Sequence, residues 1–205
     1  MSGRPNGAAG FPEAVPVSVR SRGRPTGALR SAGMPVDPAT LRILFHPEPV
    51  LREKAKPVDP GSEEVRAVAV RMLELMHGAP GVGLAAPQVG LPWRLFVANW
   101  GGDDGQDRVF VNPELSEPSA RTESDEEGCL SLPEIRAEVR RPVGVTVRAH
   151  DAAGSPVELA AEGFAARVIQ HEFDHLEGVL ILDKMTRLDR LANRRAIAEL
   201  EAGGG

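Results

Sequence analysis

Two histidines separated by three residues are the part of this sequence best suited to chemistry. His171 and His175 flank Glu172 in the string Gln-His-Glu-Phe-Asp-His, which begins at residue 170. On a helix of about 3.6 residues per turn both imidazoles project from one face, so they can bind one metal ion. Glu172 lies beside them, where its carboxylate can handle the protons of a water molecule without being a ligand. The alternative, a chance pattern on a solvated helix, is uncommon in a chain with only five histidines.

The single cysteine of the chain is a candidate third ligand. Cys129 stands in the string Glu-Gly-Cys-Leu-Ser at 127–131, which has the character of a loop or a strand edge. A lone free cysteine is most often inert packing in a core. A thiolate here would instead complete a Cys-His-His set and leave the fourth tetrahedral position open, as a catalytic site requires. Spacing alone leaves both interpretations open.

A segment of small residues that includes one amide side chain is the third candidate. Residues 81–90 read Gly-Val-Gly-Leu-Ala-Ala-Pro-Gln-Val-Gly. Glycine and alanine let another backbone approach closely, so this segment can pair with an extended peptide, and Gln88 can donate its amide hydrogens to an oxyanion. The Lys and the Ser or Thr of a phosphate-binding loop are absent. Read singly, such a segment is more often a tight packing turn.

Helical periodicity predicts three helices. An amphipathic helix is expected to begin after the N-cap Ser62 and to end at Gly78, and the histidine helix is expected to run from about Gly163 to Gly178. A capping-box pattern predicts that a C-terminal helix starts at Thr186. Its basic residues are Arg187, Arg190, Arg194 and Arg195. They form either a solvated helix face or a surface for a partner.

Alternating and apolar runs predict the strands. Residues 95–98 and 109–111 are expected to form one hairpin, and residues 143–149 and 156–159 a second. The apolar run 179–182 is interpreted as a short buried strand. Because strands and helices do not alternate along the chain, the fold class expected is α+β with antiparallel sheets.

Composition and charge indicate one globular domain with an added tail. Residues 1–39 are rich in Gly, Pro, Ser, Ala and Arg, which predicts a disordered N-terminal extension, and residues 40–205 are expected to form a single catalytic domain. A net charge of −5 argues against non-specific nucleic-acid binding. No apolar run is long enough for a membrane span or a secretory signal. We therefore expect a cytoplasmic protein, with organelle targeting by the Arg-rich extension as the minor alternative.

The three segments together resemble one family. Gly-Val-Gly-Leu-Ala-Ala-Pro-Gln at 81–88, Glu-Gly-Cys-Leu-Ser at 127–131 and Gln-His-Glu-Phe-Asp-His at 170–175 occur in this order and spacing in the peptide deformylases, and the chain resembles that family from about residue 40 to its end. The resemblance implies an α+β fold in which antiparallel sheets surround the central helix carrying His-Glu-x-x-His. It also implies removal of the formyl group from formylmethionine at the start of nascent polypeptides, with release of formate.

The resemblance also implies roles for individual residues. The implied metal ligands are Cys129, His171 and His175. Glu172 would be the general acid and base, Gln88 and the backbone N–H of Leu130 would bind the oxyanion, and Gly83 would contact the substrate backbone. The implied cofactor is one divalent metal ion, usually Fe2+, with Zn2+ as an alternative that the same ligands suit. The C-terminal helix fits the longer bacterial form of the family, in which such a helix can dock on the ribosome.

Helical spacing predicts part of a pocket for the methionine side chain. Phe164 and Val168 precede His171 by seven and three residues, so they share its general face and can line an apolar cavity together with Val82. Arg167 stands where relatives tend to carry an apolar side chain. We expect its aliphatic stem to line the pocket mouth, with the guanidinium pointing outward.

Two other classes of protein compete with this interpretation. Zinc peptidases of the His-Glu-x-x-His type usually take their third ligand from a distal Glu or His, and Glu-Gly-Cys-Leu-Ser has no place in them. An inactive homologue that binds ribosomes or peptides would have lost Glu172, Gln88 or a ligand, and this chain has lost none. The expected enzyme is a monomer whose partners are nascent formyl-Met polypeptides and, through its C-terminal helix, the ribosome.

Overall fold

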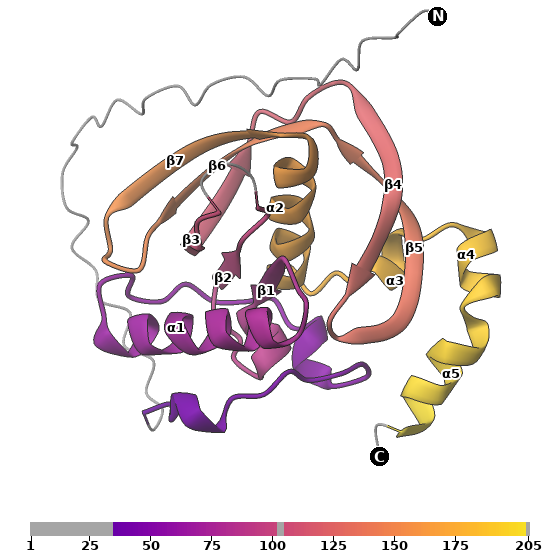
Figure 1. Cartoon of the computed structure of the whole chain (residues 1–205), viewed down its shortest axis with the longest axis horizontal. Helices are drawn as coiled ribbons and strands as arrows, with labels where there is room; N and C mark the ends of the chain where they lie inside the picture. The colour runs from indigo at the N-terminus through magenta and orange to yellow at the C-terminus, as the bar shows by residue number, and fades with distance from the viewer. Residues whose placement is uncertain (1–34, 102–104, 204–205) are drawn as a thin grey trace, which may run out of the picture.

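Two antiparallel sheets and a central helix make up the architecture of residues 35–101 and 105–203, which the computed structural model describes (Figure 1). The main sheet has the strand order β1-β2-β3-β6-β7, and β4 and β5 form a separate hairpin. The strands are β1 (Gly83–Ala85), β2 (Leu95–Ala98), β3 (Arg108–Ser116), β4 (Thr122–Cys129), β5 (Leu132–Pro142), β6 (Gly144–His150) and β7 (Pro156–Glu162). This is the α+β fold that the sequence predicted.

The helix that carries the two histidines, α2 (Gly163–Leu176), lies between the sheets. Its apolar residues Ala166, Ile169 and Leu176 are fully buried in a core shared with β2, β3 and β6. The predicted C-terminal glycine is confirmed, because Gly178 has a φ of +73°. An added Cβ there would lie 2.5 Å from the backbone oxygen of Arg52, so only glycine fits this position.

The first predicted helix is confirmed as α1 (Glu63–Gly78). The Oγ atom of Ser62 accepts a hydrogen bond from the backbone N–H of Val65 at 3.2 Å, which caps the helix. Its buried stripe packs on β1 and β2 in a second core, which contains Val68, Met72 and Leu84. Thus α1 covers the strand that follows it and holds the segment 83–88 in position.

Both predicted hairpins form. Phe96 of β2 pairs with Phe110 of β3, and Val147 of β6 pairs with Leu159 of β7. The hairpin β4–β5, in contrast, was missed by the sequence interpretation, although it carries Cys129. Of the predicted extension, residues 1–39, residues 1–34 lie outside the part that the structure describes. At its end, the backbone N–H of Val36 donates to the Glu64 carboxylate at 2.8 Å.

One expectation about the C-terminal part was wrong, whereas the helix expected to start at Thr186 does start there but is interrupted. Residues 179–182 do not form a strand, because Leu180 caps a helical turn, α3 (Ile181–Lys184), through a 2.8 Å bond from its N–H to the Asp183 carboxylate. An apolar run of four residues cannot distinguish a buried strand from a buried helical turn. The single C-terminal helix is divided at Asn193 into α4 (Arg187–Ala192) and α5 (Arg194–Gly203). Within the described ranges, no helix is both long and apolar enough to cross a bilayer.

Candidate active site

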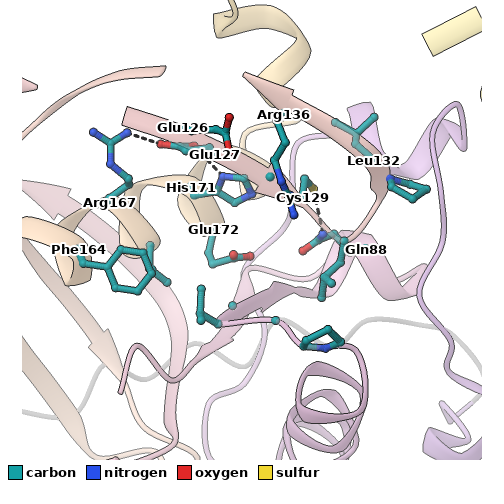
Figure 2. Close-up of a pocket in the computed structure, with 18 of the residues that line it drawn as sticks. Gln88, Glu126, Glu127, Cys129, Leu132, Arg136, Phe164, Arg167, His171 and Glu172 are labelled. Carbon is teal, nitrogen blue, oxygen red and sulfur yellow. Dashed lines mark hydrogen bonds and ion pairs between the residues drawn. The ribbon is translucent and has the colours of Figure 1, made fainter. Parts of the chain in front are cut away.

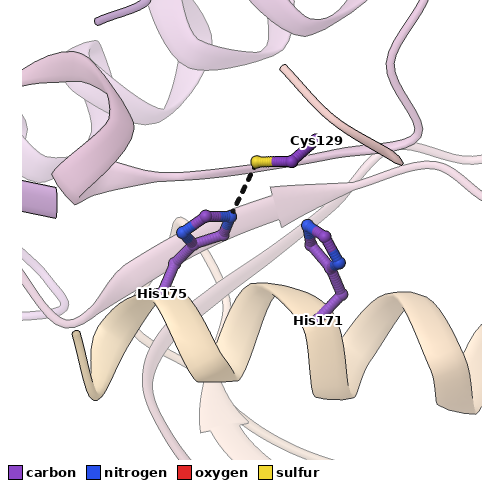
Figure 3. A group of neighbouring side chains, drawn as sticks. All are labelled: Cys129, His171 and His175. Atoms are coloured by element: carbon purple, nitrogen blue, oxygen red, sulfur yellow. Dashed lines mark hydrogen bonds between the residues drawn. The ribbon is translucent and has the colours of Figure 1, made fainter. Parts of the chain in front are cut away.

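Cys129, His171 and His175 converge although 46 residues separate the first from the last (Figure 3). Their potential ligand atoms all lie within 4.8 Å of one another, and the Cys129 Sγ atom is 3.3 Å from Nε2 of His175. Cys129 and His175 are buried, and the side chain of His171 is 12% exposed. The end of β4 and one face of α2 therefore meet, as the resemblance implied.

This donor set fits a transition-metal ion. A tetrahedral site with imidazole nitrogens and a thiolate sulfur keeps its ligand atoms about 3.5 Å apart, close to the 3.3 Å between Cys129 and His175. Nδ1 of His171 lies 2.9 Å from the Glu127 carboxylate, so its Nε2 is left for a metal. Three protein ligands also leave a coordination position open, as a catalytic site needs. Imidazole and thiolate suit zinc and iron alike.

Glu127 is a site residue whose role the sequence interpretation missed. Its carboxylate receives Nε and Nη2 of Arg141 at 2.6 and 2.8 Å, in addition to the bond with His171. Burial opposes ionisation of Glu127, but the hydrogen bonds from Arg141 and His171 outweigh it and hold the pKa well below its usual range. Glu127 is therefore an anion that orients the imidazole of His171.

Arg141 was missed because its strand was missed. On β5 the residues Ile135, Ala137 and Val139 point into the core, and Arg141 occupies the next inward position with only 3% of its side chain exposed. Its Nη1 atom also binds Asp174 of α2 at 2.8 Å. The signal was present in the sequence, since an arginine in phase with buried residues on a strand needs a buried anion.

The orientation expected for Arg167 was wrong. Its guanidinium does not point outward: it binds the Glu127 carboxylate at 2.7 Å and the backbone oxygen of Val139 at 2.8 Å, and the side chain is 11% exposed (Figure 2). A buried carboxylate and the backbone oxygens of the hairpin replace the hydrogen bonds to water that the guanidinium would otherwise make. Arg167 still lines the pocket next to Phe164 and Val168.

The amide of Gln88 is held in one orientation. Its Oε1 atom accepts a hydrogen bond from the backbone N–H of Ala85 at 2.8 Å, so the NH2 group faces the site. Nε2 lies 3.2 Å from Oγ of Ser131 and 3.5 Å from Sγ of Cys129. Ser131 is fully buried and received no role in the sequence interpretation. Leu130 lies between Cys129 and Ser131 in the turn after β4 and lines the same pocket.

Glu172 is a buried carboxylate with an unsatisfied oxygen. The residue is 4% exposed, and Oε2 has no hydrogen-bond partner among the described residues. Burial raises the pKa of Glu172 to about 7, against the opposing charge of His171. The carboxylate packs on Gly83, where an added Cβ would lie 2.3 Å from Oε1. A carboxyl group with such a pKa can both accept and donate a proton near neutral pH.

A pocket of about 450 Å³ opens beside these groups (Figure 2). Of the side chains predicted to bind substrate, Val168 is buried, whereas Val82 and Phe164 are 42% and 55% exposed. All three line the pocket, as does Gly83 of β1. Because β1 is an edge strand of the main sheet, an extended peptide has room to lie beside it.

Comparisons with known proteins agree with this geometry. The family model described as polypeptide deformylase matches residues 40–191. A peptide deformylase of Phenylobacterium zucineum is 47% identical over 154 residues, covering 74% of this chain and 91% of the relative. The crystal structure of peptide deformylase 1B from Arabidopsis thaliana, in complex with an inhibitor, has a TM-score of 0.74 and 38% identity over 80% of this chain and 91% of that one.

A bacterial structure is similar to the same extent. The peptide deformylase of Legionella pneumophila has a TM-score of 0.73 and 40% identity, covering 79% of this chain and 96% of its own. Sequence, fold and the Cys-His-His site thus point to one metal-dependent hydrolase family. The chain belongs to the peptide deformylases, enzymes that remove the N-terminal formyl group from nascent polypeptides.

Proposed function

We propose that Cys129, His171 and His175 hold the catalytic ion and that Glu172 is the general acid and base of deformylation. The observation that carries this proposal is the unsatisfied Oε2 atom of Glu172, a buried residue that lies next to His171 and lines the pocket. When bound, the metal supplies Lewis acidity, which favours attack by water on the formyl carbon. Glu172 takes a proton from the attacking water and returns it to the departing amine, so the C–N bond breaks to give formate and a free amino terminus.

Gln88 and Leu130 are proposed to stabilise the oxyanion. The NH2 group of Gln88 already faces the site, since the N–H of Ala85 holds its oxygen. A donor that needs no rearrangement during the reaction is most effective at stabilising developing charge. The backbone N–H of Leu130, next to the ligand Cys129, is proposed as the second donor.

The pocket is proposed to take the methionine side chain. Val82, Phe164 and Val168 provide its apolar lining, and Arg167 adds its aliphatic stem rather than its charge. Gly83 is proposed to meet the backbone of the substrate, because β1 is an edge strand and glycine allows close approach.

Replacement of Glu172 tests the catalytic proposal. In Glu172→Gln, formate release from a formyl-Met peptide should fall by about 10²–10⁴-fold, since proton transfer is lost, while the bound metal is retained. Glu158→Gln is the matched control, because Glu158 is exposed on β7 and binds only Arg148 among the described residues. Near-normal turnover by metal-loaded Glu172→Gln would contradict the assigned role.

We infer that the ion is Fe2+, with Zn2+ as the alternative. A thiolate with two imidazoles suits both ions, and an iron enzyme differs from a zinc enzyme in its sensitivity to oxidants, which can be tested. An iron enzyme should contain iron after anaerobic purification and lose activity with peroxide. Full activity with zinc alone, together with indifference to peroxide, would exclude this inference.

We also propose that α4 and α5 dock on the ribosome. In support, Arg187, Arg190, Arg194 and Arg195 are all exposed on them. Leu188 is also 79% exposed. Arg190 binds the backbone oxygen of Leu182 and Arg195 binds Glu199, so Arg187 and Arg194 are the better candidates for an anionic partner. Ribosome binding that survives truncation after Thr186 would exclude this surface.

The remaining proposals concern the state of the protein. We infer that residues 40–205 act as one catalytic domain, as a monomer, in the bacterial cytoplasm. The family match over residues 40–191 supports the first point. Sedimentation velocity of the full chain tests the second, with a concentration-independent monomer mass as the expected result.

A further inference from the structure

The three groups at the metal site come from two regions with different cores. The hairpin β4–β5, which carries Cys129, packs its apolar residues against Leu51, α3 and α5. The helix α2, which carries both histidines, packs instead against the main sheet. The buried residues of the hairpin and those of α2 belong to separate cores. Apolar packing alone therefore does not fix the hairpin relative to α2. Other contacts must hold the cysteine and the histidines in position relative to one another.

Polar contacts cross between the two regions. Arg141 of β5 binds Asp174 of α2 at 2.8 Å, and Glu127 of β4 binds His171 at 2.9 Å. In the middle of the helix, directly before His171, Nε2 of Gln170 donates to the backbone oxygen of Pro142 at 3.0 Å. Each of these contacts joins α2 to only one strand of the hairpin.

Arg167 differs because its guanidinium reaches both strands. Nη1 binds the Glu127 carboxylate on β4 at 2.7 Å and the backbone oxygen of Val139 on β5 at 2.8 Å. Nη2 binds the backbone oxygen of Glu123 on β4 at 3.0 Å. The side chain is 11% exposed, so these bonds form largely away from water. A planar guanidinium can meet several acceptors in fixed directions at once.

The Glu127 carboxylate is saturated by this arrangement. Oε1 receives Arg141 and Arg167, and Oε2 receives Arg141 and His171. These four donors fill the acceptor positions of one carboxylate. Removal of Arg167 would leave Oε1 with one donor and would release two backbone oxygens of the hairpin, so both the carboxylate and the strand that ends in Cys129 could shift.

We propose that Arg167 is a positioning residue that holds the Cys129-bearing hairpin on the histidine helix and thereby sets the affinity of the enzyme for its metal ion. The proposal rests on the ligand set proposed above. It assigns no contact between the guanidinium and the substrate. It also accounts for a charged side chain in a position that lines an otherwise apolar part of the pocket.

Cobalt binding to the full chain tests this role. Co2+ bound by a thiolate gives a near-ultraviolet charge-transfer band, which reports directly on Cys129. Competition with a chelator should show that Arg167→Met raises the dissociation constant for Co2+ by about 10–100-fold and alters the band, as loss of a partner around the ligands does. The dissociation constant of Arg167→Lys should lie between those of the wild type and Arg167→Met, because an ammonium group cannot reach all the same acceptors. Arg148→Met, which removes an exposed ion pair with Glu158, should leave the dissociation constant unchanged.

The outcomes separate the possible roles. An unchanged dissociation constant and band in Arg167→Met, with only a lower melting temperature, would overturn the proposal in favour of a general stabilising role. A raised KM for formyl-Met peptide with unchanged cobalt binding would overturn it in favour of a substrate contact. If Arg167→Met does not fold, Arg167→Lys carries the test, and a wild-type dissociation constant there overturns the proposal. A wild-type chain without the thiolate band would instead refute the ligand set.

Discussion

The helix α2 and the hairpin β4–β5 each supply part of one metal site, but they are held by different forces. On the histidine side, Ile169 is fully buried in a core where Phe96 stacks on Phe110 with ring centroids 4.7 Å apart. Where the hairpin meets α2, the contacts are charged, with Arg141 and Glu127 almost completely buried. Apolar packing therefore determines where the helix lies, and ion pairs determine where the hairpin lies upon it.

This difference matters because only one of the two forces depends strongly on orientation. Burial of apolar surface is non-directional and tolerates small rotations. A guanidinium and a carboxylate joined through two parallel hydrogen bonds fix orientation as well as distance. The buried pair need not add net stability, since desolvation offsets much of the attraction. Its contribution here is geometric, because Cys129 lies at the end of the strand that Glu127 occupies.

The largest expected effect comes from replacing Arg141. Arg141→Met leaves the buried carboxylate of Glu127 without its bidentate partner and weakens the link to Asp174, so the free energy of unfolding should fall by about 3–5 kcal/mol in urea denaturation. Cobalt affinity should fall as well. Ile169→Ala is the matched change on the other side: it should cost about 2–5 kcal/mol through the cavity it leaves, with cobalt affinity unchanged. Equal losses of cobalt affinity in both variants would mean that ion pairs position the metal ligands no more than apolar packing does.

A smaller effect is expected from adding a methyl group between β1 and α2. In Gly83→Ala the new Cβ would lie 2.3 Å from Oε1 of Glu172, so the carboxylate must move by about 1 Å, and kcat should fall by about 10²-fold. Gly78→Ala, at the end of α1, is the control, because nothing lies within 4 Å of its added Cβ. Full activity in Gly83→Ala would mean that this contact does not position the carboxylate of Glu172 for its proposed role.

The smallest effect is expected at the partly exposed ion pairs that follow α2. Glu177 binds Arg94 and Lys54, each at 2.6 Å, with 27% of its side chain exposed. Burial opposes its ionisation, but these hydrogen bonds prevail and lower the pKa of Glu177. A lowered pKa in the folded state stabilises above the unfolded pKa of about 4.3. Glu177→Gln should therefore cost about 1 kcal/mol at neutral pH.

The stabilisation that the carboxylate of Glu177 provides depends on pH. The advantage of the wild type over Glu177→Gln should be complete above about pH 5 and should disappear as the pH falls through the lowered pKa. Urea denaturation of both proteins at several pH values measures this difference in the free energy of unfolding. A difference that persists at low pH would assign the effect to something other than the charge of Glu177.

The residues that could be predicted from the sequence are those whose periodicity or type is unusual. His171 and His175 follow from helical spacing, and Gln88 stands out as an amide among small residues. The hairpin was not predicted, and of its residues only 127–131 were interpreted, as a loop or a strand edge. The alternation of Ile135, Ala137 and Val139 with charged residues, which Arg141 continues, was a strand signal that the interpretation did not use.

The direction of long polar side chains was beyond sequence reasoning. Arg167 could have extended into solvent or into the interior, and helical spacing gives the same Cα position for both. The partner that decides the matter, Glu127, is about forty residues away in the chain and was visible only as part of a motif. The break between α4 and α5 was unpredictable for a similar reason, because Asn193 donates to the backbone oxygen of Arg136 on β5.

The hydrogen bond between Ala85 and Gln88 has a consequence for the choice of metal. The anchor lies within the 3₁₀ turn Ala86–Val89 and its cap, so the oxygen of the Gln88 amide is held by the turn itself, while Nε2 also lies 3.5 Å from Sγ of Cys129. Exchange of one divalent ion for another would leave this donor in place. Differences in rate between metal forms of the enzyme should then arise from the coordination of the ion itself, while the proposed oxyanion donor is retained.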